Sequence, residues 1–202
     1  MPQGQVTVIP DDGLSTRERR AQPLLVVHTG DGKGKSTAAF GLALRAWSAG
    51  WPIGVFQFTK SPKWRVGEEG ALRALGDLHA TTGQGAPVTW HKMGEGWSWL
   101  RTQPEDHARA AVEGWQQVTR DLAAQTYRLL VLDEFTYPLA NGALEVTEVL
   151  AVLAARPGVQ HVVITGRRAV PALLEAADLV TEMTKIRHPM DAGRKGQRGI
   201  EW

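Results

Sequence analysis

Residues 23–37 read PLLVVHTGDGKGKST, an apolar run that enters a turn rich in glycine and lysine. Residues 24–27 predict a buried strand, and residues 38–49 predict a helix that follows the turn. Glycines in such a turn let backbone N–H groups approach phosphate oxygens, and the helix N-terminus adds positive potential. We therefore expect this part of the chain to bind a nucleoside triphosphate.

The glycine spacing of this turn departs from the usual phosphate-binding loop. The pattern G-x-x-x-x-G-K-[ST] requires glycine where Thr29 stands, and Gly30 comes one position late. The flanking strand and helix still support a phosphate-binding loop. The shifted glycine indicates that the phosphates are held differently from those in an ordinary nucleoside triphosphatase.

Two side chains of the loop are the first candidates for chemistry. Lys35 is predicted to bind phosphate oxygens, and Ser36 is predicted to ligate Mg²⁺ through its hydroxyl. Lys33 adds a second cation. Thr37 adds a second hydroxyl, for which helix capping is the alternative role.

A second candidate site lies at residues 129–134, LLVLDE, an apolar run that ends in two acids. A hard cation beside a triphosphate requires oxygen ligands, and the carboxyl ends of strands lie near the phosphates in such folds. Asp133 or Glu134 is thus predicted to bind Mg²⁺, directly or through water. The alternative is a carboxylate that only caps the turn after the strand.

The rest of the chain predicts alternating strands and helices. Further strands are expected at residues 52–58, 88–93, 128–133, 159–165 and 179–183, and helices at residues 67–75, 104–124, 144–155 and 171–177. This alternation predicts an α/β fold of the P-loop NTPase (RecA-like) kind, with a mostly parallel sheet and helices on both faces. A chain of 202 residues fits one such domain, over residues 23–202.

Residues 1–22 are predicted to form a separate polar arm. Residues 15–20, STRERR, favour a short helix with Ser15 as N-cap and Glu18 at the third helical position. The segment is either a solvated tail or an arm that closes over the ligand site with its arginines.

Residues 94–99, GEGWSW, place Trp97 and Trp99 between glycines. Such a loop presents flat apolar surfaces, either as a platform for a large planar ligand or as anchors that pack a long loop onto the core. Bases of a nucleic acid also stack on tryptophan, but no basic patch with interleaved aromatic residues accompanies this loop.

Composition excludes several other kinds of site. The chain has no cysteine, which excludes disulfides and thiolate chemistry and fits a cytoplasmic protein. The six histidines show no metal-ligand spacing such as H-x-x-x-H. No apolar run approaches the length of a membrane span, and a net charge of +2 is too small to argue for nucleic-acid binding by itself.

Several segments together resemble the P-loop type of ATP:corrinoid adenosyltransferase, also called cob(I)yrinic acid a,c-diamide adenosyltransferase. The resemblance rests on HTGDGKGKSTAAFGLALRA, GVFQFTK, GEGWSW, VLDEFTY, ITGRRAVPALLEAADLVTEM and KIRHPMDAGRKGQRGIEW, and it runs from about residue 24 to residue 202. It implies transfer of the 5′-deoxyadenosyl group of ATP to the Co(I) of a corrinoid, with triphosphate as leaving group, in cobalamin biosynthesis or salvage.

The resemblance also implies roles for particular residues. Lys35 and Glu134 would be catalytic, Ser36, Glu134 and Asp133 would hold Mg²⁺, and Trp97 and Trp99 would face the lower side of the corrin. The ATP loop would comprise Gly30, Asp31, Gly32, Lys33, Gly34, Lys35, Ser36 and Thr37. The family further implies a homodimer and an electron donor such as a reduced flavoprotein, with no nucleic-acid or membrane partner.

Two other functions remain open from the sequence. One is a P-loop ATPase that binds nucleic acid, favoured by the loop, the acid pair and a pI near 9.1. The other is an ATP-gated corrinoid carrier that binds both ligands and forms no cobalt–carbon bond.

Overall fold

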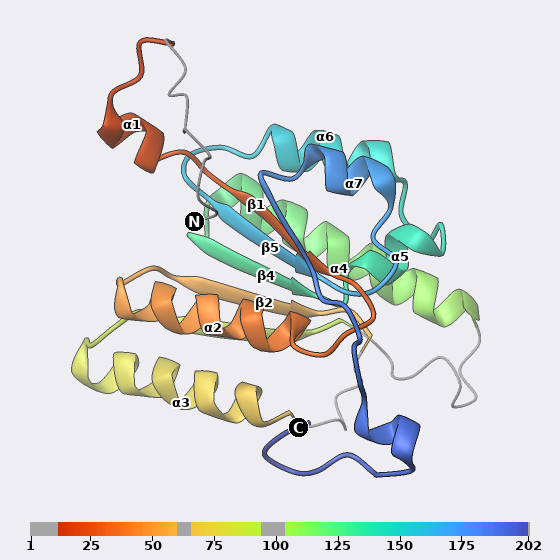
Figure 1. Ribbon diagram of the computed structural model, residues 1–202. Helices are drawn as coiled ribbons and strands as arrows, with labels where there is room; N and C mark the ends of the chain where they lie inside the picture. The colour runs from red at the N-terminus through yellow and green to blue at the C-terminus, as the bar shows by residue number, and fades with distance from the viewer. Residues whose placement is uncertain (1–11, 60–65, 94–103, 202) are drawn as a thin grey trace, which may run out of the picture.

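The computed structural model describes residues 12–59, 66–93 and 104–201, which form a sheet between two layers of helices (Figure 1). The strands are β1 (Leu25–Thr29), β2 (Ile53–Gln57), β3 (Val88–Lys92), β4 (Leu129–Asp133), β5 (His161–Thr165) and β6 (Leu179–Glu182). The helices are α1 (Thr16–Arg20), α2 (Lys35–Ser48), α3 (Gly67–Thr82), α4 (Pro104–Ala124), α5 (Thr136–Ala140), α6 (Val146–Ala154) and α7 (Pro171–Ala176), followed by a 3₁₀ turn at Pro189–Ala192.

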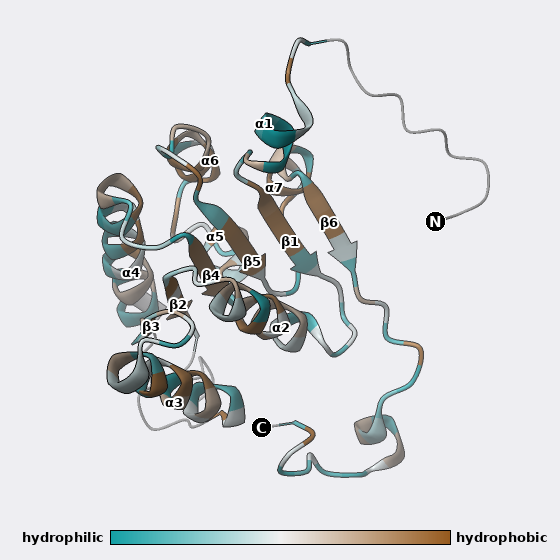
Figure 2. Cartoon of the chain, turned by 90° about the vertical axis from the view of Figure 1, so that its left-hand side faces the viewer, coloured by the Kyte–Doolittle hydropathy of each residue, from teal (hydrophilic) through white to brown (hydrophobic). Residues whose placement is uncertain are grey.

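All pairings in the six-stranded sheet are parallel, in the order β3-β2-β4-β5-β1-β6. Helices α2 and α3 cover one face, and α4, α6 and α7 cover the other (Figure 2). Every residue of β1, β2 and β4 is buried, as expected for parallel strands that are covered on both sides. The predicted α/β class and the parallel sheet are confirmed.

The core divides into two apolar clusters, one on each face of the sheet. Val27, Phe56 and Leu132 belong to the cluster under α4, α6 and α7, whereas Val26 and Val131 pack with residues of α2. Successive strand residues alternate between the clusters, as the two-residue period of a strand requires. Because of this alternation, Asp133 at the end of β4 lies on the same face of the sheet as Val131, which is the face covered by α2.

Three features of the helices differ from the prediction. Helix α2 begins at Lys35, three residues before the predicted start. Helix α3 continues to Thr82 and ends at Gly83, which has φ +74°, rather than ending at residue 75. The short helix α5 was not predicted, because its five residues lie in a loop between β4 and α6 and are too few for a periodic pattern.

The short helix predicted in the N-terminal arm is confirmed as α1. The hydroxyl of Ser15 accepts the N–H of Glu18 at 3.3 Å, and the Glu18 carboxylate accepts the N–H of Ser15 at 2.8 Å. These two reciprocal bonds form the expected capping box.

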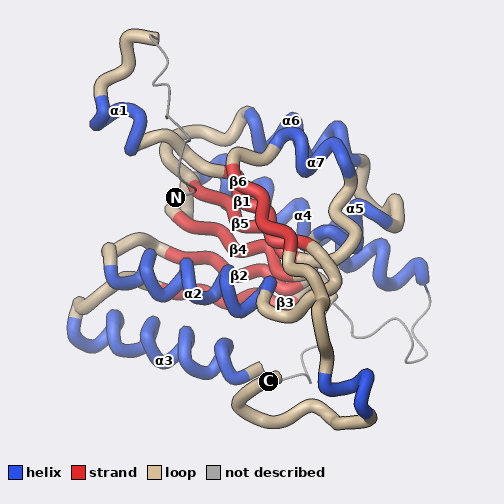
Figure 3. The backbone as a smooth tube through the Cα atoms, viewed as in Figure 1, coloured by secondary structure: helices blue, strands red, loops and turns tan. Residues whose placement is uncertain are grey.

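The tube drawing shows the carboxyl ends of the strands meeting at one edge of the sheet, where the loops after β1, β4 and β5 lie together (Figure 3). Strands β1 and β4 are the two neighbours of β5. The glycine loop after β1 and the acid pair at the end of β4 therefore lie on either side of a single strand, at the same end of the sheet. Among the described residues, none of the helices is both long and apolar enough to cross a membrane.

Candidate functional site

The glycine loop wraps around the ammonium group of Lys35. Lys35 is the first residue of α2 and is only 7% exposed. Its Nζ donates to the carbonyl oxygens of Gly30 at 2.8 Å and of Gly32 at 2.6 Å. Gly30 and Gly34 have φ of +94° and +111°, a region that favours glycine. The loop therefore places a buried cation at its centre.

Burial and nearby charges act on this ammonium group in opposite directions. Burial, the largest cause, lowers the pKa of Lys35, whereas the negative charges of Glu134 and Asp31 raise it. The influence of Glu134 means that the acid after β4 lies within electrostatic reach of the lysine in the loop after β1. The structure thus brings together the two candidate sites that the sequence placed about a hundred residues apart.

The same glycines also allow the loop to approach the segment after β6. A Cβ atom on Gly30 would lie 2.5 Å from the carbonyl oxygen of Met183, and one on Gly32 would lie 2.6 Å from it. The N–H of Gly32 donates to that carbonyl at 2.6 Å. Glycine is thus required at these positions by chain packing as well as by any phosphate, a reason that no local sequence pattern indicates.

The remaining loop residues have distinct settings. The Lys33 ammonium forms an ion pair with the carboxylate of Glu201 near the C-terminus. Ser36 and Thr37 lie in the first turn of α2, and Asp31 is exposed. The N-cap of α2 is Gly34, with no side-chain cap, so the capping role considered for Thr37 is wrong.

Asp133 lies at the centre of a buried chain of hydrogen bonds. Trp90 Nε1 donates to Gln57 Oε1 at 3.1 Å, and Gln57 Nε2 donates to Asp133 Oδ2 at 2.9 Å. From the other side, Thr165 Oγ1 donates to Asp133 Oδ1 at 2.8 Å and accepts the backbone N–H of Glu134 at 3.0 Å.

The direction of each bond in this chain is fixed from both ends. An indole N–H only donates, so Gln57 turns its oxygen to Trp90 and its amide nitrogen to Asp133. The carboxylate of Asp133 only accepts, so the hydroxyl proton of Thr165 goes to Asp133, and a lone pair of the same hydroxyl oxygen accepts the backbone N–H of Glu134. Both oxygens of Asp133 thus accept bonds, and its carboxylate is fully buried behind the site.

Glu134 follows with an unusual backbone conformation that turns it away from this buried chain. Its φ is +60°, in the left-handed region that few residues other than glycine adopt. A Cβ atom on Gly166, after β5, would lie 3.3 Å from Glu134 Oε2, so the loop after β5 packs close to this carboxylate. The two acids therefore have different settings: Asp133 lies under α2, and Glu134 lies near Lys35.

Sequence reasoning missed a group of side chains from the neighbouring loops, namely Arg167 and Arg168 after β5 and Tyr137 of α5. The positive charge of Arg167 opposes that of Lys35 and lowers the pKa of that lysine further. Burial and the charge of Glu134 raise the pKa of Tyr137, and the two arginines oppose this rise. The pair GRR directly after a predicted strand was the available signal, because that strand lies beside β1.

Trp97 and Trp99 lie outside the described residues, so their predicted role stays a prediction. Within the described ranges, no group of three or more acidic or histidine side chains is arranged to hold a metal ion. Any metal here would thus take ligands from the loop hydroxyl, one or two acids and a bound substrate.

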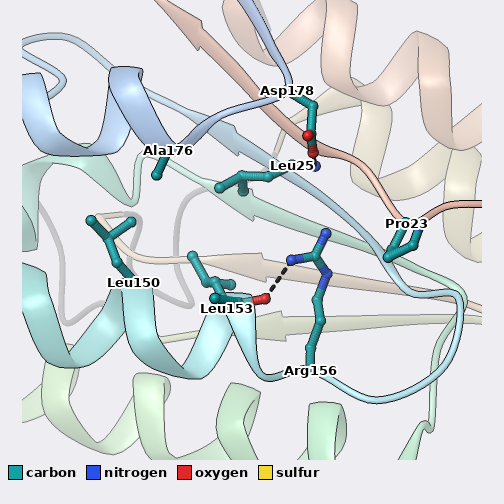
Figure 4. A pocket seen from close by; sticks show the side chains of 8 residues that line it. Pro23, Leu25, Leu150, Leu153, Arg156, Ala176 and Asp178 are labelled. Atoms are coloured by element: carbon teal, nitrogen blue, oxygen red, sulfur yellow. Dashed lines mark hydrogen bonds between the residues drawn. The ribbon is translucent and has the colours of Figure 1, made fainter. Parts of the chain in front are cut away.

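A cavity of about 250 Å³ lies at the amino end of β1 (Figure 4). Leu25, Leu150 and Leu153 form much of its apolar wall, and Arg156 extends across it toward Asp178. The guanidinium donates to the carbonyl oxygens of Leu153 and Gln160. Arg156 therefore satisfies a carbonyl group at the C-terminal end of α6. The cavity lies at the sheet edge opposite the glycine loop and is separate from the candidate site.

Comparison with known proteins gives a consistent result over nearly the whole chain. A sequence profile described as ATP:corrinoid adenosyltransferase BtuR/CobO/CobP matches residues 21–202. The chain belongs to the ATP:corrinoid adenosyltransferase family.

Individual relatives of this adenosyltransferase are similar along their length. It is 40% identical to the corrinoid adenosyltransferase of Pseudomonas aeruginosa over 195 residues, which cover 96% of this chain and 90% of that protein. It is 39% identical to corrinoid adenosyltransferase CobA of Salmonella typhimurium over 194 residues, which cover 95% and 93% of the two chains. The solved flagellar accessory protein FlaH of Methanocaldococcus jannaschii is a distant match, with a TM-score of 0.49 and 11% identity over 80% of this chain and 71% of that chain.

Proposed function

We propose that this adenosyltransferase moves the 5′-deoxyadenosyl group of ATP to the Co(I) of a corrinoid, either cob(I)yrinic acid a,c-diamide or cob(I)alamin. The cobalt electron pair attacks C5′, a cobalt–carbon bond forms, and the C5′–oxygen bond breaks so that triphosphate leaves. The nucleophile belongs to the substrate, so the protein needs no nucleophilic side chain. The chain has no cysteine, in agreement with this chemistry.

The observation that carries the proposal is the setting of Lys35. Its ammonium is buried inside a glycine loop, with Glu134 and Arg167 in electrostatic reach. A buried cation that is held in place before the reaction stabilises negative charge more strongly than one in water. The reaction produces such a charge, because the triphosphate carries away the electrons of the broken C5′–oxygen bond. Lys35 is therefore the residue we assign to the leaving group.

The residues near the loop also fit Mg²⁺. This cation prefers oxygen ligands and is usually held by one or two carboxylates together with substrate phosphates. Ser36 supplies a hydroxyl at the start of α2 and Glu134 a carboxylate near Lys35, whereas both Asp133 oxygens already accept hydrogen bonds. We assign Glu134 and Ser36 to the metal and Asp133 to positioning. When bound, Mg²⁺ would neutralise part of the triphosphate charge.

The corrinoid site and the partners are proposed on other grounds. Trp97 and Trp99 would supply a flat aromatic surface that has no atom able to coordinate cobalt. Such a surface leaves the lower face of cobalt without a ligand. A reduced flavoprotein would supply the electron for Co(I). A cytoplasmic location is supported by the absence of cysteine.

A homodimer is supported by the edge strand β6. Its apolar residues Leu179 and Val180 are 44% and 43% exposed, and Leu44 of α2 is 49% exposed. Exposed apolar side chains on an edge strand favour association with another chain. Sedimentation of the wild type and of Val180→Glu would test this, because the charge should shift any dimer toward monomer.

The assay of the proposed function combines the protein with ATP, Mg²⁺ and chemically reduced cob(I)alamin. We expect a light-sensitive alkyl-cobalt spectrum and an equal amount of triphosphate. Lys35→Met should abolish both, whereas Arg45→Met should retain them, because Arg45 is an exposed basic residue at the far end of the same helix.

The same assay separates the competing functions. Release of orthophosphate without an alkyl-cobalt product would support an ATPase. Binding of both substrates without either product would support a corrinoid carrier. Either result would overturn the proposed transfer.

A further inference from the structure

The C-terminal segment, residues 184–201, is attached to the glycine loop at both of its ends. At its start, the N–H of Met183 donates to the carbonyl of Thr29 at 2.9 Å, and the Met183 carbonyl accepts the N–H of Gly32 at 2.6 Å. At its end, the carboxylate of Glu201 pairs with the ammonium of Lys33. Between these points the segment passes from β6 across the sheet edge to the side of α3 (Figures 1 and 2). We call residues 184–201 the strap.

The apolar side chains of the strap contribute little burial, and its buried side chain is that of His188, which is 8% exposed. Ile186, Met190 and Ile200 are 95%, 70% and 82% exposed. The Glu201 side chain, in contrast, is only 15% exposed, and its backbone N–H donates to the carbonyl of Gln197 at 2.8 Å. The ion pair to Lys33 is thus a principal tie between the far end of the strap and the loop.

Lys33 and Lys35 occupy different positions in one short loop. The ammonium of Lys35 is enclosed by loop carbonyls, whereas the Lys33 side chain is 58% exposed. The hydrogen bond from Lys33 lowers the pKa of Glu201, so the carboxylate is ionised at neutral pH. An anion is therefore already present at the outer cation of the loop.

A triphosphate in the loop would compete with this carboxylate. Both are anions that seek the Lys33 ammonium, and like charges held at one cation repel each other. A partly exposed ion pair stabilises a structure only weakly, by a factor of about 1.4 to 5 in the equilibrium constant, so a polyanion is able to displace it. The flexible stem of lysine lets the ammonium turn from one anion to the other.

We propose that Glu201 takes the place of the triphosphate at Lys33 in the nucleotide-free protein, and that ATP binding draws Lys33 away and releases the strap. The proposal rests on the proposed function only in placing the ATP triphosphate at the glycine loop. By linkage, a strap that opens when ATP binds must also oppose ATP binding while it is closed. Departure of the triphosphate lets the strap close again.

The test uses Glu201→Gln, which removes the charge and keeps the shape of the side chain. Calorimetric titration with ATP, and separately with inorganic tripolyphosphate, should show about 1.4- to fivefold tighter binding than in the wild type, the range expected when a partly exposed ion pair is lost. Asp191→Asn is the matched control. It breaks the Lys185–Asp191 pair inside the strap and leaves the loop untouched, so both affinities should stay at the wild-type value.

Amide hydrogen exchange of the strap supplies an independent measurement. ATP should speed exchange in residues 184–201 of the wild type. In Glu201→Gln, exchange should be fast without ATP and should change little when ATP is added. Lys33→Gln breaks the same pair from the other side and should also give fast exchange without ATP.

Two outcomes would overturn the proposal. Weaker or unchanged ATP binding by Glu201→Gln would mean that Glu201 positions Lys33 for the phosphates or has no role. Slower strap exchange in the wild type on addition of ATP would mean that nucleotide closes the strap. No step of this test involves a corrinoid, so strap release without alkyl-cobalt formation would refute the proposed transfer and leave the strap proposal standing.

Discussion

Replacement of Asp133 by asparagine tests the hydrogen-bond chain behind the candidate site. Asp133 accepts bonds from Gln57 and Thr165, and the indole N–H of Trp90 fixes the orientation of the Gln57 amide. Asparagine has one oxygen and one NH₂ group. If the NH₂ faces Gln57, two amide donors meet; if it faces Thr165, that hydroxyl oxygen accepts both the NH₂ and the N–H of Glu134, and its own proton loses the bond to residue 133. Either orientation leaves one donor without the bond that it makes in the wild type.

The magnitude follows from the two losses at this buried position. One charge-assisted hydrogen bond is lost, at about 1.5–3 kcal/mol, and one donor is left buried without an acceptor, at about 1–3 kcal/mol. We expect the free energy of unfolding to fall by about 3–5 kcal/mol. For a domain of this size, that is a decrease in Tm of roughly 6–20 °C.

Scanning calorimetry and urea unfolding of Asp133→Asn and Glu134→Gln provide the comparison. Glu134→Gln should unfold within a few degrees of the wild type, because its side chain lies outside the Asp133 chain, but it should lose most turnover at limiting Mg²⁺. Wild-type stability in Asp133→Asn would refute the directional argument. A large loss of stability in Glu134→Gln would refute the division of roles between the two acids.

Further predictions concern two glycines and a buried histidine. Gly30→Ala should lower the free energy of unfolding by at least about 2 kcal/mol in urea unfolding and weaken ATP binding more than tenfold, because of its positive φ and the close Met183 carbonyl. Gly41→Ala in α2, where a Cβ meets nothing within 4 Å, should instead raise the free energy of unfolding by about 0.5–1 kcal/mol. Burial lowers the pKa of His28, so the unfolded chain binds more protons than the folded chain just below the ordinary imidazole value of about 6.5, and stability should fall as pH drops through that value. His28→Phe should therefore show a smaller decrease in Tm between about pH 7.5 and 5.5 than the wild type; an equal decrease would mean that other groups control the acid response.

The parts of this fold that the sequence predicted are those with strong local patterns. Strands β1, β2, β4 and β5 are built around apolar runs, and all six strands were located to within a few residues. The capping box of α1 was predicted because its two side chains are three residues apart. The loop at residues 30–37 was predicted from its glycines, lysines and hydroxyls, which lie within eight residues, and its binding of phosphate stays a prediction. In each case the interacting groups are close in the chain.

The parts that the sequence did not predict depend on contacts between distant segments. Nothing near Gly32 indicates that its N–H will bind Met183, and nothing near Lys33 indicates a pair with Glu201. The extension of α3 to Thr82 crosses a stretch of mixed polarity, where the packing of the helix on β3 and not its own pattern decides where it ends. Such contacts follow from the order of the strands in the sheet. The alternation of strands and helices along the sequence does not determine that order.

The buried layer at the strand ends shows why this distinction matters for function. Gln57, Asp133 and Thr165 are aligned in register across β2, β4 and β5, and all three face α2. Each taken alone looks like an ordinary polar residue at the end of an apolar strand. Only the register shows that they form one chain of donors and acceptors that holds the N–H of Glu134. A shift of one residue in any of these strands would turn its polar side chain (Gln57, Asp133 or Thr165) to the opposite face of the sheet. The hydrogen bonds that position Glu134 therefore also disfavour a misaligned sheet.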